Sequence, residues 1–148
     1  MTQYEACQKL LFVAKGELGV HETPGPEATA RIMEYEKHTN RGYTGSDEEA
    51  WCAKFACFVT DTAGFKGTNS AAARSFLKWG KKLEAPVPGC IVVFDRKDAN
   101  NPNAAHVTFF LYEEKAHGTI RCLGGNQGNM VKESSYDVGK VLGYRSPI

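Results

Sequence analysis

The chain has 148 residues, which is the size of one ordinary domain with a single core. Its 18 Lys and Arg residues nearly balance its 17 Asp and Glu residues, so the net charge of +1 excludes a general electrostatic attraction to nucleic acid or anionic lipid. The N-terminal residues lack the pattern of a signal peptide, and no apolar run reaches membrane-spanning length. We therefore expect synthesis in the cytoplasm, no membrane insertion, no nucleic-acid binding and a partner that is recognised locally.

Four helices are predicted in the N-terminal half, over residues 2–18, 28–39, 52–63 and 71–79. The first begins with Thr2 and Glu5, which have the spacing of a capping box, and its apolar pattern stops at Gly19. The turn HETPGPE separates it from the second, more polar helix. Gly64 follows the third helix, and Ser70 is the candidate cap of the short fourth one.

After Pro86 the pattern changes to short segments rich in β-branched and aromatic residues, separated by Gly, Asn and Pro. Five strands are predicted, over residues 90–95, 106–113, 119–124, 130–136 and 140–145. Helices followed by a run of strands indicate an α+β fold, with N-terminal helices packed on a C-terminal antiparallel β-sheet. The sequence contains no linker or repeat, so residues 1–148 are expected to form a single catalytic domain.

The five cysteines are scattered without a C-x-x-C pair, so neither a disulfide framework nor a zinc knuckle is predicted. The stretch EEAWCAKFACFV places Cys52 at the predicted start of a helix, where free backbone N–H groups and the helix dipole lower the pKa of a thiol. Cys57 lies about 140° further round the helix and is predicted to pack in the core. The alternative that Cys52 is itself a core cysteine, beside Trp51, stays open at this point.

A cysteine nucleophile needs a base, usually a histidine that the fold brings near. The four histidines are His21, His38, His106 and His117. His21 and His38 lie near predicted turns, and His117 is expected in a solvent-exposed hairpin turn. His106 is the preferred base because it begins the apolar strand HVTFFLY, with a purely structural histidine as the alternative.

The stretch LGGNQGN, residues 123–129, follows a predicted strand. Its glycines allow a close approach of the backbone, and Asn126 or Gln127 can accept a hydrogen bond from the far nitrogen of a catalytic imidazole. A plain hairpin turn is the alternative, because Gly and Asn also favour turns.

Four motifs, in a fixed order, carry a resemblance to a known family. They are WCAKF, PGCIVVF, AHV and LGGNQ, and the N-terminal LGVHETPG adds to them. The chain resembles the papain-like peptidoglycan amidases and peptidases of the NlpC and CHAP type, and among them a compact single-domain group common in phage lysins. The resemblance implies a papain-like fold in which Cys52 is the nucleophile, His106 the general base and Asn126 the residue that orients the imidazole.

Two positions depart from the family pattern. Cys90 stands where the family usually carries an acid after Pro-Gly, which affects the local turn more than the activity. Gly124 stands where some CHAP relatives carry a Glu, so a Glu-assisted histidine is not supported. Gln127 is the reserve for the third catalytic role, and the resemblance makes Glu22, in the HETPG turn, a candidate substrate-binding residue.

The implied reaction is hydrolysis of an amide bond in bacterial peptidoglycan through a thioester, with no cofactor and no metal. Trp51 and Tyr35 are candidate walls of a substrate groove between the nucleophile helix and the sheet, although Trp51 is equally well explained as core. The sequence does not distinguish the bond between muramic acid and the stem peptide from one within the stem or cross-bridge. We expect a monomer that acts at the cell wall or in the periplasm after release or delivery from a bacterial host cytoplasm.

Two other functions remain open. A cysteine enzyme that acts on a protein, such as a deamidase or peptidase toxin, would use the same three residues. A virion structural or binding protein would keep the fold with a silent site. A zinc site made by Cys52, Cys57 and His106 is disfavoured, because the two cysteines face different directions on one helix.

Overall fold

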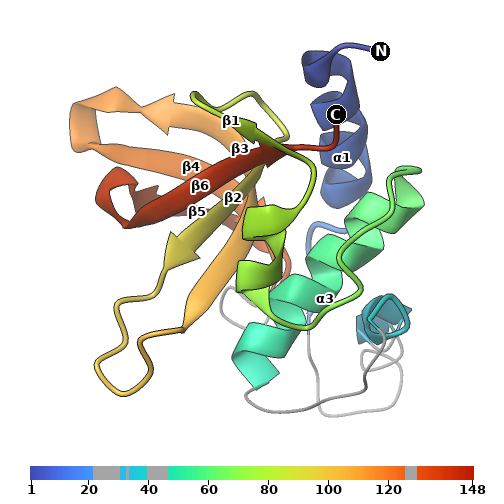
Figure 1. The fold of residues 1–148 in the computed structure, drawn as a ribbon, viewed down its shortest axis with the longest axis horizontal. Helices are drawn as coiled ribbons and strands as arrows, with labels where there is room; N and C mark the ends of the chain where they lie inside the picture. The colour runs from blue at the N-terminus through green and yellow to red at the C-terminus, as the bar shows by residue number, and fades with distance from the viewer. Residues whose placement is uncertain (22–30, 33, 40–46, 126–129) are drawn as a thin grey trace.

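The computed structural model describes residues 1–21, 31–32, 34–39, 47–125 and 130–148 of the chain. In this part of the chain, helices pack beside a six-stranded antiparallel sheet with the strand order β1-β6-β2-β3-β4-β5 (Figure 1). The predicted α+β fold, with N-terminal helices and a C-terminal antiparallel sheet, is confirmed at this level. Among the described residues, none of the helices has the length and apolar character that crossing a membrane requires.

The first helix, α1, spans Gln3–Gly16 and begins with the predicted capping box. The backbone N–H of Glu5 donates to the Thr2 hydroxyl at 3.1 Å, and the Thr2 N–H donates to the Glu5 carboxylate at 3.1 Å. Gly19, at a φ of 93°, lies in the turn that follows the helix. The residues that α1 buries are Ala6, Cys7, Leu10, Leu11 and Ala14.

The helix that carries Cys52 starts earlier than predicted. This helix, α3, spans Asp47–Thr62, so the expected start at Cys52 is wrong. Acidic residues favour the first turn of a helix because they interact with the positive end of its dipole, and Glu and Ala are strong helix formers. The sequence DEEA therefore begins α3 instead of ending the loop before it. Cys52 is the sixth residue of α3 and lies in its second turn.

Residues 31–32 and 34–36 are helical, within the region of the predicted second helix. Arg31 Nε lies 2.7 Å from Oε1 of Glu17, and Glu17 is the residue that follows the end of α1. Lys54 of α3 is buried, and its Nζ lies 2.8 Å from Glu36 Oε1. These two ion pairs join the described residues 31–32 and 34–36 to the end of α1 and to α3.

The fourth predicted helix is a short 3-10 helix, η1, over Ala73–Lys78. Ala72, and not Ser70, occupies its N-cap position, and no side chain caps it. The Ser70 hydroxyl instead accepts a hydrogen bond from the Ala72 N–H at 3.1 Å. The predicted cap residue therefore stabilises the turn ahead of η1.

The strands are β1 (Lys81–Leu83), β2 (Ile91–Asp95), β3 (Ala105–Glu114), β4 (Thr119–Gly124), β5 (Lys132–Asp137) and β6 (Val141–Ser146). All five predicted strands are present, with boundaries shifted by at most two residues. The additional strand, β1, has the sequence KKL and pairs with β6 at the edge of the sheet. Its short, charged sequence gives no strand signal by itself.

The central strands have two apolar faces, because successive side chains of a strand point to opposite sides. One face packs with α3 and η1, and β2 and β3 contribute Ile91, Val93, Val107 and Phe109 to it. The opposite face forms a second cluster, to which the same strands contribute Val92, Phe94 and Phe110. The sheet curls around this second cluster, since the Phe94 ring on β2 stacks on the Tyr136 ring on β5 with centroids 4.6 Å apart.

Candidate active site

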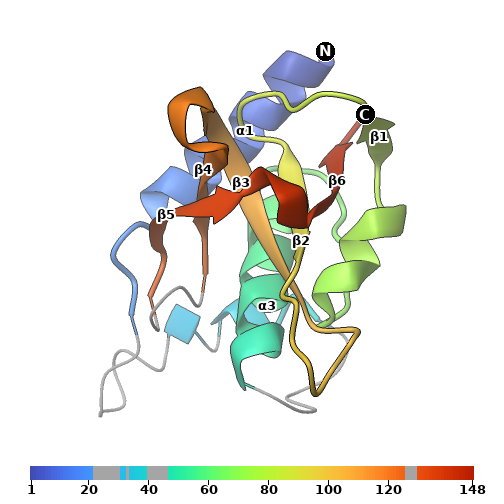
Figure 2. The same cartoon turned by 90° about the vertical axis from the view of Figure 1, so that its left-hand side faces the viewer.

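Three of the predicted site segments meet at one end of the molecule. The first turns of α3 lie at the same end as the start of β3 and the end of β4 (Figure 2). A Cβ built on Gly125, directly after β4, would stand 2.2 Å from Cζ3 of Trp51 on α3. A Cβ built on Gly124 would stand 3.0 Å from Cγ2 of Thr108 on β3. The two glycines thus allow the close backbone approach that the LGGNQGN stretch predicted.

Cys52 is fully buried in the second turn of α3. This position contradicts the prediction that Cys52 lies at the helix N-terminus. The effect of the helix dipole falls off within the first turn, and the N–H of a residue this far along has an acceptor within the helix. The helix by itself therefore gives little reason for a lowered thiol pKa, and any activation of Cys52 requires a nearby side chain.

His106 is the second residue of β3 and is partly buried. Its cross-strand partner on β2 is Phe94, so both side chains lie on the same face of the sheet. Ala105 and Val107, on either side of His106, face the cluster that contains Cys52. The imidazole therefore belongs to the inner face of the curled sheet, at the end of the sheet that α3 reaches.

Tyr136 on β5 is a site residue that the sequence analysis missed. Its ring centroid lies 5.6 Å from that of His106, with the two ring planes at 42°. Burial raises the pKa of Tyr136, and negative charge at Cys122 and at Cys52 would raise it further. Tyr136 thus lies beside the His106 ring. The sequence could have indicated that this side chain is buried, because Tyr136 is the single aromatic residue of the otherwise polar strand KESSYD.

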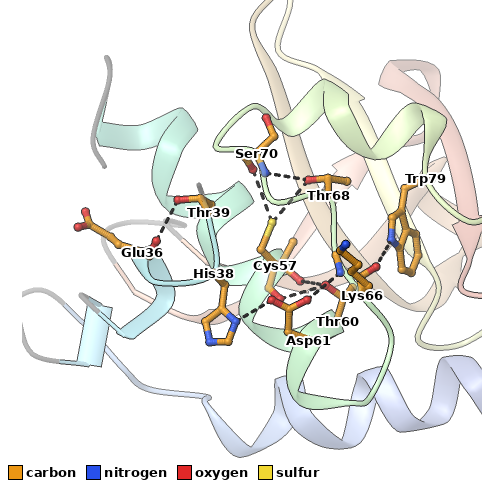
Figure 3. A network of polar contacts seen from close by, with 12 residues as sticks. Glu36, His38, Thr39, Cys57, Thr60, Asp61, Lys66, Thr68, Ser70 and Trp79 are labelled. Carbon is orange, nitrogen blue, oxygen red and sulfur yellow. Dashed lines mark hydrogen bonds and ion pairs between the residues drawn. The ribbon is translucent and has the colours of Figure 1, made fainter. Parts of the chain in front are cut away.

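Cys57 packs in the core as predicted. Its thiol lies 3.5 Å from the Thr68 hydroxyl and donates to the Ser70 carbonyl, also at 3.5 Å (Figure 3). Burial raises the pKa of the Cys57 thiol above its usual range.

The other cysteines outside the proposed site also have raised thiol pKa values. Burial raises the pKa of Cys7, and it raises those of Cys90 and Cys122 to about 12. These thiols, like that of Cys57, stay protonated near neutral pH and are poor nucleophiles.

The remaining histidines lie elsewhere, as their sequence positions indicated. His21 is exposed and contacts the Gly19 carbonyl through Nδ1 at 2.9 Å, and His117 is exposed in the 3-10 turn between β3 and β4. His38 Nδ1 lies 2.7 Å from Asp61 Oδ2, near the C-terminal end of α3 (Figure 3). Asp61 is about 13 Å along the helix from Cys52 at 1.5 Å per residue. His106 therefore remains the best candidate for the base.

Tyr35 does not line a groove, contrary to the prediction. It is fully buried, and its hydroxyl donates to Glu17 Oε1 at 2.8 Å. Its ring makes edge contacts with the rings of Trp51 and Phe55, at centroid distances of 5.7 and 5.2 Å. Trp51 is only 4% exposed, so its side chain takes the core position that was the alternative to a groove wall. The aromatic packing is the physical reason, because it removes both rings from solvent.

Three predicted site residues, Glu22, Asn126 and Gln127, lie outside the described residues. The described residues just before HETPG and just after LGGNQGN are hydrogen-bonded to each other. The Gly19 N–H donates to the Val131 carbonyl at 2.9 Å, and the Val131 N–H donates to the Val20 carbonyl at 2.8 Å. The turn that leads to HETPG is therefore paired with the chain that follows LGGNQGN.

A groove of about 520 Å³ lies between α1 and the end of α3 and contains none of the predicted site residues. It is lined by Glu5, Gln8, Lys9, Phe12, Val13, Thr62 and Ala63. Within the described ranges, no three His, Cys, Asp or Glu side chains are grouped so that they could hold a metal ion.

Two comparisons with known proteins were made. No protein-family model matches the chain, and a search of curated proteins finds no match.

Proposed function

We propose that this protein is a papain-like cysteine hydrolase that cleaves an amide bond in bacterial peptidoglycan, with Cys52 as the nucleophile and His106 as the general base. The substrate class comes from the resemblance of the WCAKF, PGCIVVF, AHV and LGGNQ motifs to NlpC and CHAP enzymes. The observation that supports the reaction type is the position of His106 between Ala105 and Val107, which pack in the same apolar cluster as Cys52. The elements that carry Cys52 and His106, α3 and β3, thus pack on each other although the two residues are far apart in the sequence.

In the proposed reaction, His106 removes the proton from the Cys52 thiol, and the thiolate attacks the amide carbonyl carbon. The tetrahedral intermediate collapses to a thioester while the imidazolium protonates the leaving amine. A water molecule, deprotonated by His106, then attacks the thioester and releases the carboxyl product, and the proton returns to the Cys52 sulfur. A positioned acid–base group contributes on the order of 10²- to 10⁴-fold to the rate of such a reaction.

Two details of this mechanism follow from the start of α3 at Asp47. The thiolate is stabilised mainly by the His106 imidazolium, because Cys52 lies beyond the turn where the helix dipole acts. The N–H of the sixth residue of an α-helix has its acceptor within the helix, so we assign the donors that stabilise the oxyanion to neighbouring segments and not to Cys52 itself.

Asn126 orients the imidazole in this proposal, with Gln127 in reserve. Both follow Gly125, whose backbone packs against the ring of Trp51, the residue before Cys52. An amide side chain that accepts a hydrogen bond from the far imidazole nitrogen fixes the tautomer in which the near nitrogen can take a proton.

Digestion of purified peptidoglycan sacculi under reducing conditions tests the proposal. The wild-type protein, Cys52→Ala and Cys57→Ala are compared, and the released fragments are identified by mass spectrometry. Cys57→Ala is the matched control, because Cys57 is a buried cysteine on the same helix whose pKa is raised. We expect fragments from the wild type and from Cys57→Ala, and none from Cys52→Ala.

The new chain ends of the fragments identify the bond that is cleaved. Equal fragment release by Cys52→Ala would exclude Cys52 as the nucleophile. Sacculi left intact by all three proteins would exclude a peptidoglycan substrate, and incubation with protein substrates would then separate a cysteine enzyme that acts on proteins from a silent binding protein.

A further inference from the structure

Tyr136 reaches across the curled sheet to His106. The tyrosine lies on β5, whereas His106 lies on β3 and its cross-strand partner Phe94 lies on β2. The Tyr136 ring stacks on Phe94, with centroids 4.6 Å apart and planes at 26°, and lies 5.6 Å from the His106 ring. The three rings form one cluster, which we term the aromatic clamp: Phe94, His106 and Tyr136.

The aromatic clamp exists only because the sheet curls. In the strand order, β3 and β4 lie between β2 and β5. Neighbouring strands are about 4.8 Å apart, so in a flat sheet the backbones of β2 and β5 would be separated by about 14 Å. The 3-10 turn Val138–Lys140 joins β5 to β6, and β6 pairs with β2, which brings the end of β5 back toward β2 (Figure 2).

The His106 ring has aromatic neighbours on its own face of the sheet. Phe94 faces His106 directly across the ladder, and Tyr136 contacts both rings. Tyr136 is also partly buried and packs against the second apolar cluster. The Tyr136 ring is therefore held in place by Phe94 and the second apolar cluster, and it restricts the rotation of the His106 imidazole.

We propose that Tyr136 is a positioning residue that holds the His106 imidazole in the orientation in which it serves Cys52. This inference deepens the proposed function and rests on it for the role of His106. Tyr136 acts through His106 and need not touch the substrate.

The electrostatic surroundings suit this role. Beyond the effect of burial, negative charge at Cys122 on β4 or at Cys52 on α3 would raise the pKa of Tyr136, whereas a hydrogen bond with Ser134 and the charge of Arg96 lower it. Burial raises the pKa of Tyr136, so the phenol stays neutral throughout the pH range in which a Cys–His pair works. A neutral ring beside the imidazole restricts its orientation without adding a negative charge that would oppose thiolate formation.

The first test measures the contact in the wild-type protein, without any substrate. With isotope-labelled protein, NMR should show nuclear Overhauser effects between the carbon-bound ring protons of His106 and those of Tyr136. The absence of these effects in the folded protein would overturn the inference. This measurement requires no mutation and no activity.

The second test compares Tyr136→Phe, Tyr136→Leu and the control Tyr112→Leu. Tyr112 is 53% exposed on β3 and makes no ring contact with His106 among the described residues. Tyr136→Phe keeps the ring and should preserve both the His106 chemical shifts and the kcat for sacculi. Tyr136→Leu removes the ring current, so the His106 ring protons should shift, and kcat should fall by up to about 100-fold with little change in KM.

The outcomes separate this inference from the proposed function. If the His106 spectrum shifts in Tyr136→Leu, the contact between the two rings is supported whatever the substrate. If the wild type also leaves sacculi intact, the peptidoglycan assignment alone is refuted. An unchanged His106 spectrum in a folded Tyr136→Leu would overturn the positioning role. An active wild type whose kcat is unaffected by Tyr136→Leu would overturn it as well.

Discussion

Gly125 lies against Trp51 so closely that no side chain fits between them. A Cβ at position 125 would stand 2.2 Å from Cζ3 and 2.5 Å from Cε3 of the indole, and 2.9 Å from Cβ of Phe55. The indole is held in turn by its contacts with the rings of Tyr35 and Phe55. The backbone after β4 is thereby fixed against α3, immediately ahead of Asn126.

Gly125→Ala is expected to destabilise the protein, because the added methyl group overlaps a buried ring that cannot move away. Overpacking of this kind costs about 1–3 kcal/mol of unfolding free energy. The expected result is a lower midpoint in urea denaturation with an unchanged slope. Hydrolysis of sacculi should decrease as well, since the displaced segment carries Asn126.

Gly16→Ala is the matched control for this substitution. A Cβ at Gly16, the last residue of α1, meets no atom within 4 Å. The same chemical change should therefore leave the midpoint unchanged or raise it slightly. If Gly125→Ala and Gly16→Ala behaved alike, the close packing of Gly125 on Trp51 would be refuted.

Alkylation near neutral pH should label Cys52 before the other cysteines. All five thiols are buried, so exposure does not distinguish them. The pKa values of Cys7, Cys57, Cys90 and Cys122 are raised, which keeps these thiols protonated and slow to react. Only Cys52 is expected to have a histidine partner. Peptide mapping after brief treatment with iodoacetamide at pH 7 identifies the labelled site.

His106→Ala provides the control for the labelling prediction. If His106 takes the proton of Cys52, its removal should slow the labelling of Cys52 and leave the other thiols unaffected. Preferential labelling of Cys57 or Cys90 in the native wild type would contradict the assignment of Cys52 as the reactive thiol.

Glu17→Gln should destabilise the fold, because Glu17 joins the end of α1 to the helical segment that carries Arg31 and Tyr35. The carboxylate accepts hydrogen bonds from Nε and a terminal nitrogen of Arg31, at 2.7 Å each, and from the buried Tyr35 hydroxyl at 2.8 Å. Hydrogen bonds to a charged group contribute about 1.5–3 kcal/mol each, so a loss of about 1–3 kcal/mol is expected for the neutral amide. Chemical denaturation measures this loss.

Glu34→Gln is the comparison for Glu17→Gln. Glu34 pairs with Lys37 within one turn, and both side chains are largely exposed. Ion pairs of this kind contribute little to stability, so no measurable change in the denaturation midpoint is expected. A loss for Glu34→Gln as large as that for Glu17→Gln would mean that burial of Glu17 does not determine the effect.

Stability should fall as the pH rises above about 8.5, the usual pKa of a thiol in an unfolded chain. Burial raises the pKa of both Cys90 and Cys122 to about 12, so the folded state keeps protons that the unfolded state releases. A raised pKa gives stability that is fully present below the unfolded value and is lost as the pH approaches the folded one. Each thiol contributes a slope of about 1.4 kcal/mol per pH unit in this window.

Urea denaturation of the reduced protein between pH 8 and pH 10.5 checks the alkaline prediction. Cys90→Ala removes one of the two groups and should give a shallower pH dependence than the wild type. A wild-type stability that stays constant over this range would show that the two thiols ionise equally readily in the folded and unfolded states.

The sequence by itself determined most of the secondary structure and its division into a helical half and a strand half, although it missed β1 and the start of α3. The capping box of Thr2 and Glu5 fixed the start of α1, and the alternation of β-branched and aromatic residues located β2 through β6. It also identified Cys57 as a packing residue and His117 as a turn residue. These features depend on neighbours within a few positions along the chain, so a local pattern is sufficient to predict them.

Only the tertiary structure decided which of these residues share a neighbourhood. The curl of the sheet places Tyr136 beside His106, and the aromatic packing around Tyr35 removes it from any groove. The start of α3 at Asp47 places Cys52 in the second turn, beyond the turn in which the helix dipole acts. The contacts of Tyr136 and Tyr35 join residues far apart in the chain, and their formation depends on how the whole sheet twists and closes, which no local periodicity encodes.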